Sequence, residues 1–269
     1  MQYRKAMGIT SDSIDFYNDR LSRALKALGN PYAVASEDVI AYLNSIPANK
    51  IGLSTRHASW RTLKTFYRWL NKTYGFENVM ERVPVPDIAP VEKAILPTLS
   101  LEQLKRLIQV EPTAKGKAII ALAAASGLRL RELAQIQVEH IDWQGKRIWT
   151  KGKGQKEGYA IIGFAEPYLA AWLEESGKVS GSLFDYSASG LQTWFTRLEK
   201  RTGIKANAHT FKRSFAFILK ELGMDIEQIR ILGRWEKIDM PIRYTKAFTF
   251  ANASKLLNQK VVGLSSLLS

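Results

Sequence analysis

Apolar residues recur every three or four positions along the first part of the chain, and this spacing predicts three amphipathic helices. The first covers about residues 14–28 and ends at Gly29-Asn30-Pro31, where a glycine and a proline stop a helix. A second is predicted over about 36–46 and a longer third over 53–74, with aromatic residues and leucines on one side and basic residues on the other. Together they predict a small all-α domain over residues 1–82.

A proline-rich stretch follows, VPVPDIAPVEKAILP, with prolines at positions 84, 86, 90 and 97. Proline fixes φ and lacks a backbone donor, so this stretch is expected to be extended and not helical. It is interpreted as an interdomain linker over residues 83–98.

The pattern of the second half predicts helices around one small sheet. Ser100 and Gln103 have the spacing of a capping box, and the apolar run 117–125 predicts a helix buried on all sides. Two apolar runs, 147–150 and 159–162, flank a glycine-rich turn and predict a β-hairpin. Further helices are predicted at about 129–137, 166–176, 189–202, 210–222, 225–232, 238–244 and 250–260. The fold class is therefore mainly α, with a mixed α+β domain over 99–250 that holds a small antiparallel sheet, and a tail over 251–269.

The charge balance points to a polyanionic partner. The 39 Lys and Arg against 25 Asp and Glu give a net charge of +14 and a pI near 9.8, and clustered basic side chains favour nucleic acid through phosphate contacts and counterion release. The chain has no cysteine, and its three histidines have no metal-ligand spacing, so no metal and no cofactor are expected. No apolar run is long enough to span a membrane, so a cytoplasmic, nucleoid-associated protein is expected.

Three short motifs, in this order, carry a resemblance to a known family. They are Ser126-Gly127-Leu128-Arg129-Leu130-Arg131-Glu132-Leu133, the hairpin turn Gly152-Lys153-Gly154-Gln155-Lys156-Glu157, and the stretch from His209 through Gly233-Arg234-Trp235 to Tyr244. In sequence and spacing the chain resembles the tyrosine recombinases of the phage-integrase and Xer kind. The resemblance implies a SAM-like core DNA-binding domain over 1–82, a catalytic domain over 99–250 and a C-terminal tail that docks on a neighbouring protomer. It also implies double-stranded DNA with a specific recombination site as substrate, strand exchange through a Holliday junction, and a homo-tetramer on that DNA.

The resemblance also implies the roles of single residues. Tyr244 matches the nucleophile that forms a 3′-phosphotyrosyl link, and Glu132 matches the partner that holds the first arginine. The other catalytic candidates are Arg129, Lys153, His209, Lys212 and Trp235. The basic residues expected to contact DNA are Arg56, Arg61, Lys64, Arg68, Lys156, Arg197, Lys200, Arg201 and Lys205.

One position departs from the family pattern. Lys212 stands where the family has its second arginine, and lysine supplies a charge without the two-pronged donor geometry of a guanidinium. Arg213 is the alternative, although neighbouring helical residues point about 100° apart. The departure leaves open a natural variant or an introduced substitution, and an activity lowered by Lys212.

Three other interpretations compete. A type IB topoisomerase would use the same tyrosine, arginine and lysine chemistry to relax supercoiled DNA. A non-catalytic or catalytically weakened DNA-binding protein on the same scaffold would fit Lys212. A basic helical regulator would need all three motif matches to be coincidental, since each of these residues taken singly also suits an ordinary helix pair, turn or core.

Overall fold

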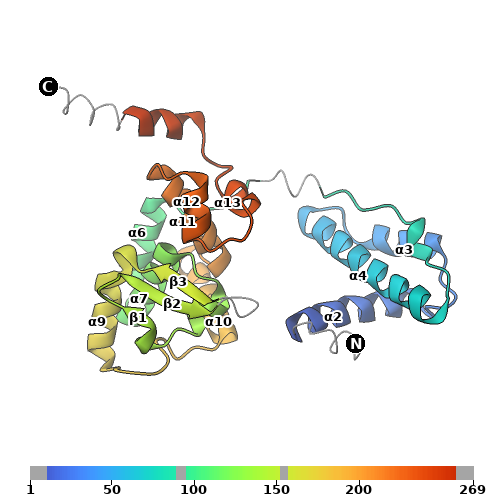
Figure 1. Cartoon of the computed structure of the whole chain (residues 1–269), viewed down its shortest axis with the longest axis horizontal. Helices are drawn as coiled ribbons and strands as arrows, with labels where there is room; N and C mark the ends of the chain where they lie inside the picture. Colours follow the sequence, from blue (N-terminus) through green and yellow to red (C-terminus); the bar gives the residue numbers. More distant parts are fainter. Residues whose placement is uncertain (1–10, 89–94, 152–156, 259–269) are drawn as a thin grey trace. The chain divides into compact units, whose positions relative to one another are not determined.

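The chain forms two compact units, Met1–Ala94 and Ile95–Ser269. A computed structural model describes residues 11–88, 95–151 and 157–258 (Figure 1). The boundary between the units falls inside the stretch interpreted from its prolines as a linker. The domain roles assigned from the sequence remain predictions.

The first unit is built from three helices and a short 3₁₀ turn. They are α2 (Ser11–Leu28), α3 (Ser36–Ser45), α4 (Lys50–Tyr74) and η1 (Val79–Glu81). The side chain of Asn49 caps the start of α4 by accepting a hydrogen bond from Gly52 N, and Gly75 ends the helix in the left-handed region at φ 77°. Apolar side chains at Val39, Leu63 and Leu70 form a shared core. The three helices predicted from the apolar spacing are confirmed.

In the second unit, one helix, α7 (Ala114–Ser126), is buried in the main hydrophobic core. Every residue from Ala118 to Ser126 is buried, as the continuous apolar run predicted. Ser100 and Gln103 form the predicted capping box at the start of α6. The remaining helices are α6 (Leu101–Val110), α8 (Leu130–Ala134), α9 (Glu166–Ser176), α10 (Ala188–Thr202), α11 (Ala208–Glu221), α12 (Ile226–Leu232) and α13 (Asp239–Tyr244), with 3₁₀ turns η2 (Val138–His140) and η4 (Gly163–Ala165). Residues 250–258 are also helical.

A three-stranded antiparallel sheet lies beside these helices in the order β1-β2-β3 (Figure 1). Its strands are β1 (Ile141–Asp142), β2 (Arg147–Lys151) and β3 (Glu157–Ile161), and Trp149 pairs with Tyr159 in the β2–β3 register. The predicted hairpin is confirmed, and the two-residue strand β1 was not predicted. The mainly α fold with one small antiparallel sheet is therefore as expected, while the turn 152–156 lies outside the described residues.

A second, smaller core joins the last helices of this unit. Phe215 and Leu219 on α11, Ile229 on α12 and Trp235 after α12 are buried together, and Tyr244 on α13 packs against them. This core fixes α11, α12 and α13 on one another, so residues far apart in the sequence meet beside the end of α7.

Candidate active site

A glycine turn at the end of α7 places Arg129. Gly127 adopts the left-handed conformation at φ 56°, and a Cβ there would lie 2.6 Å from the ring of Phe215, so only glycine fits. The chain then turns outward, and Arg129 becomes the residue before the first turn of α8. Its side chain is 40% exposed. The motif thus presents a half-exposed guanidinium at the edge of a buried helix.

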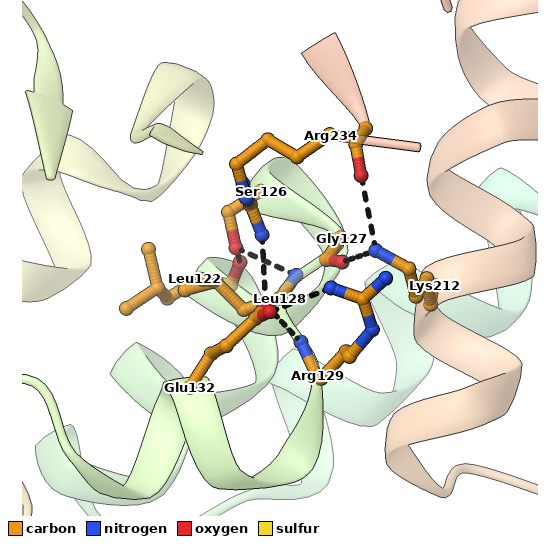
Figure 2. Close-up of polar contacts among 9 residues, drawn as sticks. Leu122, Ser126, Gly127, Leu128, Arg129, Glu132, Lys212 and Arg234 are labelled. Atoms are coloured by element: carbon orange, nitrogen blue, oxygen red, sulfur yellow. Dashed lines mark hydrogen bonds and ion pairs between the residues drawn. The ribbon is translucent and has the colours of Figure 1, made fainter. Parts of the chain in front are cut away.

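Glu132 is the buried carboxylate that holds this arginine. Its Oε1 accepts from Arg129 Nη1 at 2.7 Å, and its Oε2 accepts from the Arg129 backbone N–H at 2.8 Å. Oε2 also accepts from Arg234 Nη2 at 2.8 Å (Figure 2). Burial alone would raise the pKa of Glu132, but the Arg129 N–H and the charges of Arg234 and Arg129 hold that pKa below its ordinary value. Glu132 is therefore an ionised anchor for two guanidiniums.

Lys212 lies on α11 with its ammonium turned into the protein. Only 4% of the residue is exposed. Nζ donates to the carbonyl of Gly127 at 2.7 Å (Figure 2) and to that of Gly233 at 3.2 Å. It also lies 4.6 Å from the centre of the Trp235 ring. Burial, together with the charges of Arg129 and Arg234, lowers the pKa of Lys212 to about 7, against an opposing effect of Glu132. The side chain therefore ties two backbone turns together, and a pKa of about 7 leaves it only partly protonated at neutral pH.

Arg213 has partners of its own. Its Nε donates to Pro97 O at 2.9 Å and its Nη2 donates to Thr210 Oγ1 at 3.0 Å. It does not share the two carbonyl partners of Lys212, as the angle between neighbouring helical residues led us to expect. Its charge instead acts on Tyr244, where it partly opposes the rise in pKa that burial causes.

Trp235 and Tyr244 meet edge to face. Their ring centres are 5.6 Å apart at an interplanar angle of 66°. Trp235 is 4% exposed, and its Nε1 has no hydrogen-bond partner within the described part of the chain. Burial raises the pKa of Tyr244, while the charges of Arg213, Arg243 and Arg129 act in the opposite direction. The phenol therefore lies half-buried in a positive field.

His209 lies at the first turn of α11. The side chain of Asn207 caps this helix by accepting from Thr210 N at 3.0 Å. His209 itself is exposed at the protein surface. Loss of hydration against the helix, followed by the charges of Arg213, Lys212 and Arg129, lowers the pKa of His209 below its ordinary value of 6.5. At neutral pH the imidazole is uncharged and one of its nitrogens can accept a proton.

The structure thus brings most of the predicted catalytic residues into one neighbourhood. Direct contacts or electrostatic interactions link five of them, Arg129, Glu132, Lys212, Trp235 and Tyr244, and the charges of Lys212 and Arg129 also act on His209. Lys153 and Lys156, predicted on the hairpin turn, lie outside the described residues. Sequence reasoning did not single out Arg234, because nothing in its neighbourhood in the chain points to Glu132.

The residues predicted to contact DNA from α4 are not alike in their surroundings. Arg61 and Arg68 are exposed, whereas Lys64 lies over the Trp60 ring with Nζ 4.6 Å from its centre. Arg56 donates to the carbonyl of Ile46 and is partly buried.

In the second unit, all four predicted residues that the structure describes are exposed, namely Arg197, Lys200, Arg201 and Lys205. Arg201 is paired with the buried carboxylate of Glu111. Its guanidinium therefore also has a structural partner inside the unit.

None of the helices within 11–88, 95–151 and 157–258 is long and apolar enough to cross a membrane. The same residues contain no group of three or more His, Asp or Glu side chains arranged to hold a metal ion.

Comparison with known proteins gives consistent matches. The model of the phage integrase family matches residues 97–249. Tyrosine recombinase XerA of Saccharolobus solfataricus is 24% identical over 263 residues, which cover 95% of this chain and 84% of the relative.

Two crystal structures of lambda integrase share the fold. The dimer of residues 75–356 bound to a COC′ core site has a TM-score of 0.75 at 15% identity, covering 91% of this chain and 93% of the other. The tetramer bound to a Holliday junction has a TM-score of 0.70 at 15% identity, covering 88% and 77%.

Proposed function

The chain belongs to the phage integrase family, and on this premise we propose that it is a site-specific DNA recombinase that cleaves and rejoins strands through a 3′-phosphotyrosyl intermediate at Tyr244. The observation that carries the proposal is the setting of the phenol. Tyr244 packs edge to face on Trp235, and the positive charges of Arg213, Arg243 and Arg129 interact electrostatically with its phenol. Positive charge beside a phenol favours both the phenolate and an approaching phosphate.

Cleavage is an exchange of one phosphoester for another. The Tyr244 oxygen attacks the scissile phosphorus, the bond from phosphorus to the 5′-oxygen breaks, and the phosphate stays on the 3′ side as a phosphotyrosine. The phenolic proton goes to a base, for which uncharged His209 is the candidate. The leaving 5′-oxygen gains a proton from an acid, for which Lys153 on the hairpin turn is the candidate.

Charge on the phosphate is balanced by arginine. Arg129 offers the N–H groups that Glu132 does not occupy, and a guanidinium fork suits the non-bridging oxygens of a phosphodiester. Because protein cations supply this charge, we propose that the reaction needs no metal or cofactor. Activity unchanged by a chelator such as EDTA would agree with this, and loss of cleavage in EDTA with recovery on Mg²⁺ would contradict it.

Exchange requires a second DNA strand and further protomers. Attack of a partner's 5′-hydroxyl on the phosphotyrosine reverses the first step and joins the new strands, and two rounds pass through a Holliday junction. Lambda integrase forms a tetramer on such a junction, and we propose a homo-tetramer here on double-stranded DNA with a specific site. The segment 251–269 is proposed to dock on a neighbouring protomer, and we place the protein in the cytoplasm with the nucleoid.

The test is a denaturing gel with nicked suicide DNA, on which loss of a short fragment traps the covalent intermediate. The wild-type chain is expected to give a protein–DNA adduct that Tyr244→Phe abolishes while DNA binding persists. Phenylalanine keeps the ring against Trp235, so the fold is preserved. An adduct that survives in Tyr244→Phe would overturn the assignment of the nucleophile.

The burial of Lys212 favours one alternative, a DNA-binding protein with weakened or absent cleavage. In that case the wild-type chain would shift DNA in a native gel and give no adduct on the suicide substrate. A type IB topoisomerase would relax supercoiled plasmid that lacks a recombination site, and the recombinase would not.

A further inference from the structure

Arg234 has a backbone conformation that its residue type rarely adopts. It lies at φ 55°, in the left-handed region where glycine is the usual resident and where another residue costs about 1 kcal/mol or more. The turn folds the Trp235 ring back onto Gly233, where a Cβ would overlap the ring. A glycine at 234 would make the same turn without strain, so the turn itself does not require an arginine.

That side chain runs to the buried carboxylate that anchors Arg129. Arg234 Nη2 donates to Glu132 Oε2 at 2.8 Å across 102 positions of sequence, and the side chain is only 16% exposed. Arg129 Nη1 takes the other oxygen, and Figure 2 shows the two guanidiniums approaching Glu132 from different sides. One carboxylate is therefore shared by two arginines.

The side chain of Arg234 passes close to a glycine of the sheet. Its Cδ would lie 3.8 Å from a Cβ on Gly158, which is in strand β3 opposite Thr150. Its Nη1 is shielded from solvent and has no hydrogen-bond partner among the described residues. The guanidinium is thus held beneath the surface by Glu132 and the sheet, and it does not face solvent as a phosphate ligand would.

The local charge is left positive. The two positive guanidiniums of Arg129 and Arg234 share one negative carboxylate, Glu132. Their charges also act on each other and on Lys212. Lys212 does not supply an outward donor, since its Nζ is buried and bonded to two carbonyls. If Arg129 were its only partner, Glu132 would neutralise that guanidinium in an ion pair. A second arginine on the same carboxylate leaves a net positive charge beside the phosphate position.

We propose that Arg234 is a positioning residue for strand cleavage: it binds Glu132 so that Arg129 is held in place with net positive charge directed at the scissile phosphodiester. It thereby supplies the second guanidinium of the site from the turn after α12, while Lys212 on α11 serves as an internal tie. This inference rests on the proposed function, since it assigns Arg234 a role in the same cleavage step.

The first experiment measures adduct formation on suicide DNA in single turnover, with DNA binding and thermal unfolding followed in parallel. Arg234→Gln is expected to slow cleavage 10- to 100-fold, as expected for loss of one charge-stabilising interaction, with DNA affinity within about 3-fold of wild type. Arg234→Lys keeps the charge, and its cleavage rate is expected to lie between those of wild type and Arg234→Gln. Arg106→Gln, an exposed arginine on α6, is the matched control and should cleave like wild type.

A double-mutant cycle tests the route through the carboxylate. If Arg234 acts through Glu132, the Glu132→Gln/Arg234→Gln protein should cleave within about 2-fold of Glu132→Gln alone, because coupled residues are not additive. Losses that multiply, or an Arg234→Gln protein that cleaves at the wild-type rate, would overturn the proposal.

A neutral substrate separates positioning of charge from general support of the fold. A methylphosphonate at the scissile position removes the negative charge that Arg129 balances. The deficit of Arg234→Gln should then shrink at least several-fold, and an equal deficit on both substrates would overturn the proposal. If the wild-type chain gives no Tyr244-dependent adduct, the proposed function fails; if it does and Arg234→Gln matches it, only this inference fails.

Discussion

The ammonium of Lys212 donates a hydrogen bond to the carbonyl of Gly127 over 2.7 Å, which ties helix α11 to the turn that carries Arg129. A second bond to Gly233 O extends the tie to the turn before Arg234. A lysine with two N–H groups on carbonyls satisfies both acceptors even when it is uncharged. The contact explains how a lysine is accommodated in the interior with 4% exposure.

Lys212 should make stability depend on pH in the neutral to alkaline range. Its pKa falls from 10.5 to about 7 on folding. Between these values the unfolded chain binds a proton that the folded chain lacks, so the free energy of unfolding rises with pH, by at most about 1.4 kcal/mol per pH unit. Urea unfolding of wild type and Lys212→Met at pH 7, 8 and 9 should show this rise in the difference between the two proteins.

The matched control is Lys205→Met, which removes an exposed lysine. Its unfolding free energy should run parallel to that of wild type across the series. A Lys212→Met curve that is also parallel to wild type would mean that Lys212 titrates normally in the folded protein.

Lys212→Arg should raise the rate of cleavage. A guanidinium has five donors, so two can satisfy Gly127 and Gly233 while the others extend towards the phosphate. Single-turnover adduct formation is expected to increase several-fold, with DNA affinity unchanged. An unchanged rate in a protein of normal stability would place Lys212 outside the catalytic position.

The pH profile of cleavage should report His209. Its pKa lies below 6.5 because of lost hydration and of the charges of Arg213, Lys212 and Arg129, so the base is lost only on the acid side. The rate should rise with pH up to an apparent pKa below 6.5, and His209→Gln should remove this limb and lower the plateau 10- to 100-fold. His57→Gln on α4 is the control and should keep the limb; a limb that survives in His209→Gln would assign the base to another group.

Trp235 could act through the packing of its ring or through its indole N–H, and two substitutions can distinguish these roles. Its ring packs on Tyr244 and under Lys212, while its Nε1 has no partner in the described part of the chain. Trp235→Phe keeps a ring and should cleave within about 5-fold of wild type, whereas Trp235→Ala should lower stability by about 3–5 kcal/mol through the cavity it leaves. If Trp235→Phe folds normally and loses most cleavage, the indole N–H contacts the substrate.

The sequence was informative where the determinants are local. The capping box of Ser100 and Gln103, the buried helix α7 and the β2–β3 hairpin follow from spacing within one element. Strand β1 has two residues and no periodicity of its own, so only its pairing with β2 defines it.

The tertiary features of the site could not be predicted from the sequence, because their determinants are not local. A lysine in an amphipathic helix is expected to face solvent, and only the carbonyls of Gly127 and Gly233, from two other segments, make its burial favourable. Arg234 likewise owes its place to Glu132, far along the chain, and to a left-handed turn that its residue type disfavours. Neither the carbonyl partners of Lys212 nor the carboxylate partner of Arg234 can be predicted from the residues that neighbour them in the sequence.

DNA affinity should depend on salt in a way that separates the basic residues of α4 from Arg201. Arg61 and Arg68 are exposed, and as phosphate contacts each should contribute about one unit to the slope of log affinity against log salt concentration. Arg61→Ala and Arg68→Ala are therefore expected to weaken binding to all sequences alike and to reduce the slope by about one each, measured by fluorescence anisotropy between about 50 and 200 mM salt. Arg201 pairs with buried Glu111, so Arg201→Ala should chiefly lower the melting temperature by leaving that carboxylate unpaired. An unchanged slope in the double variant Arg61→Ala/Arg68→Ala would remove this face of α4 from the DNA interface.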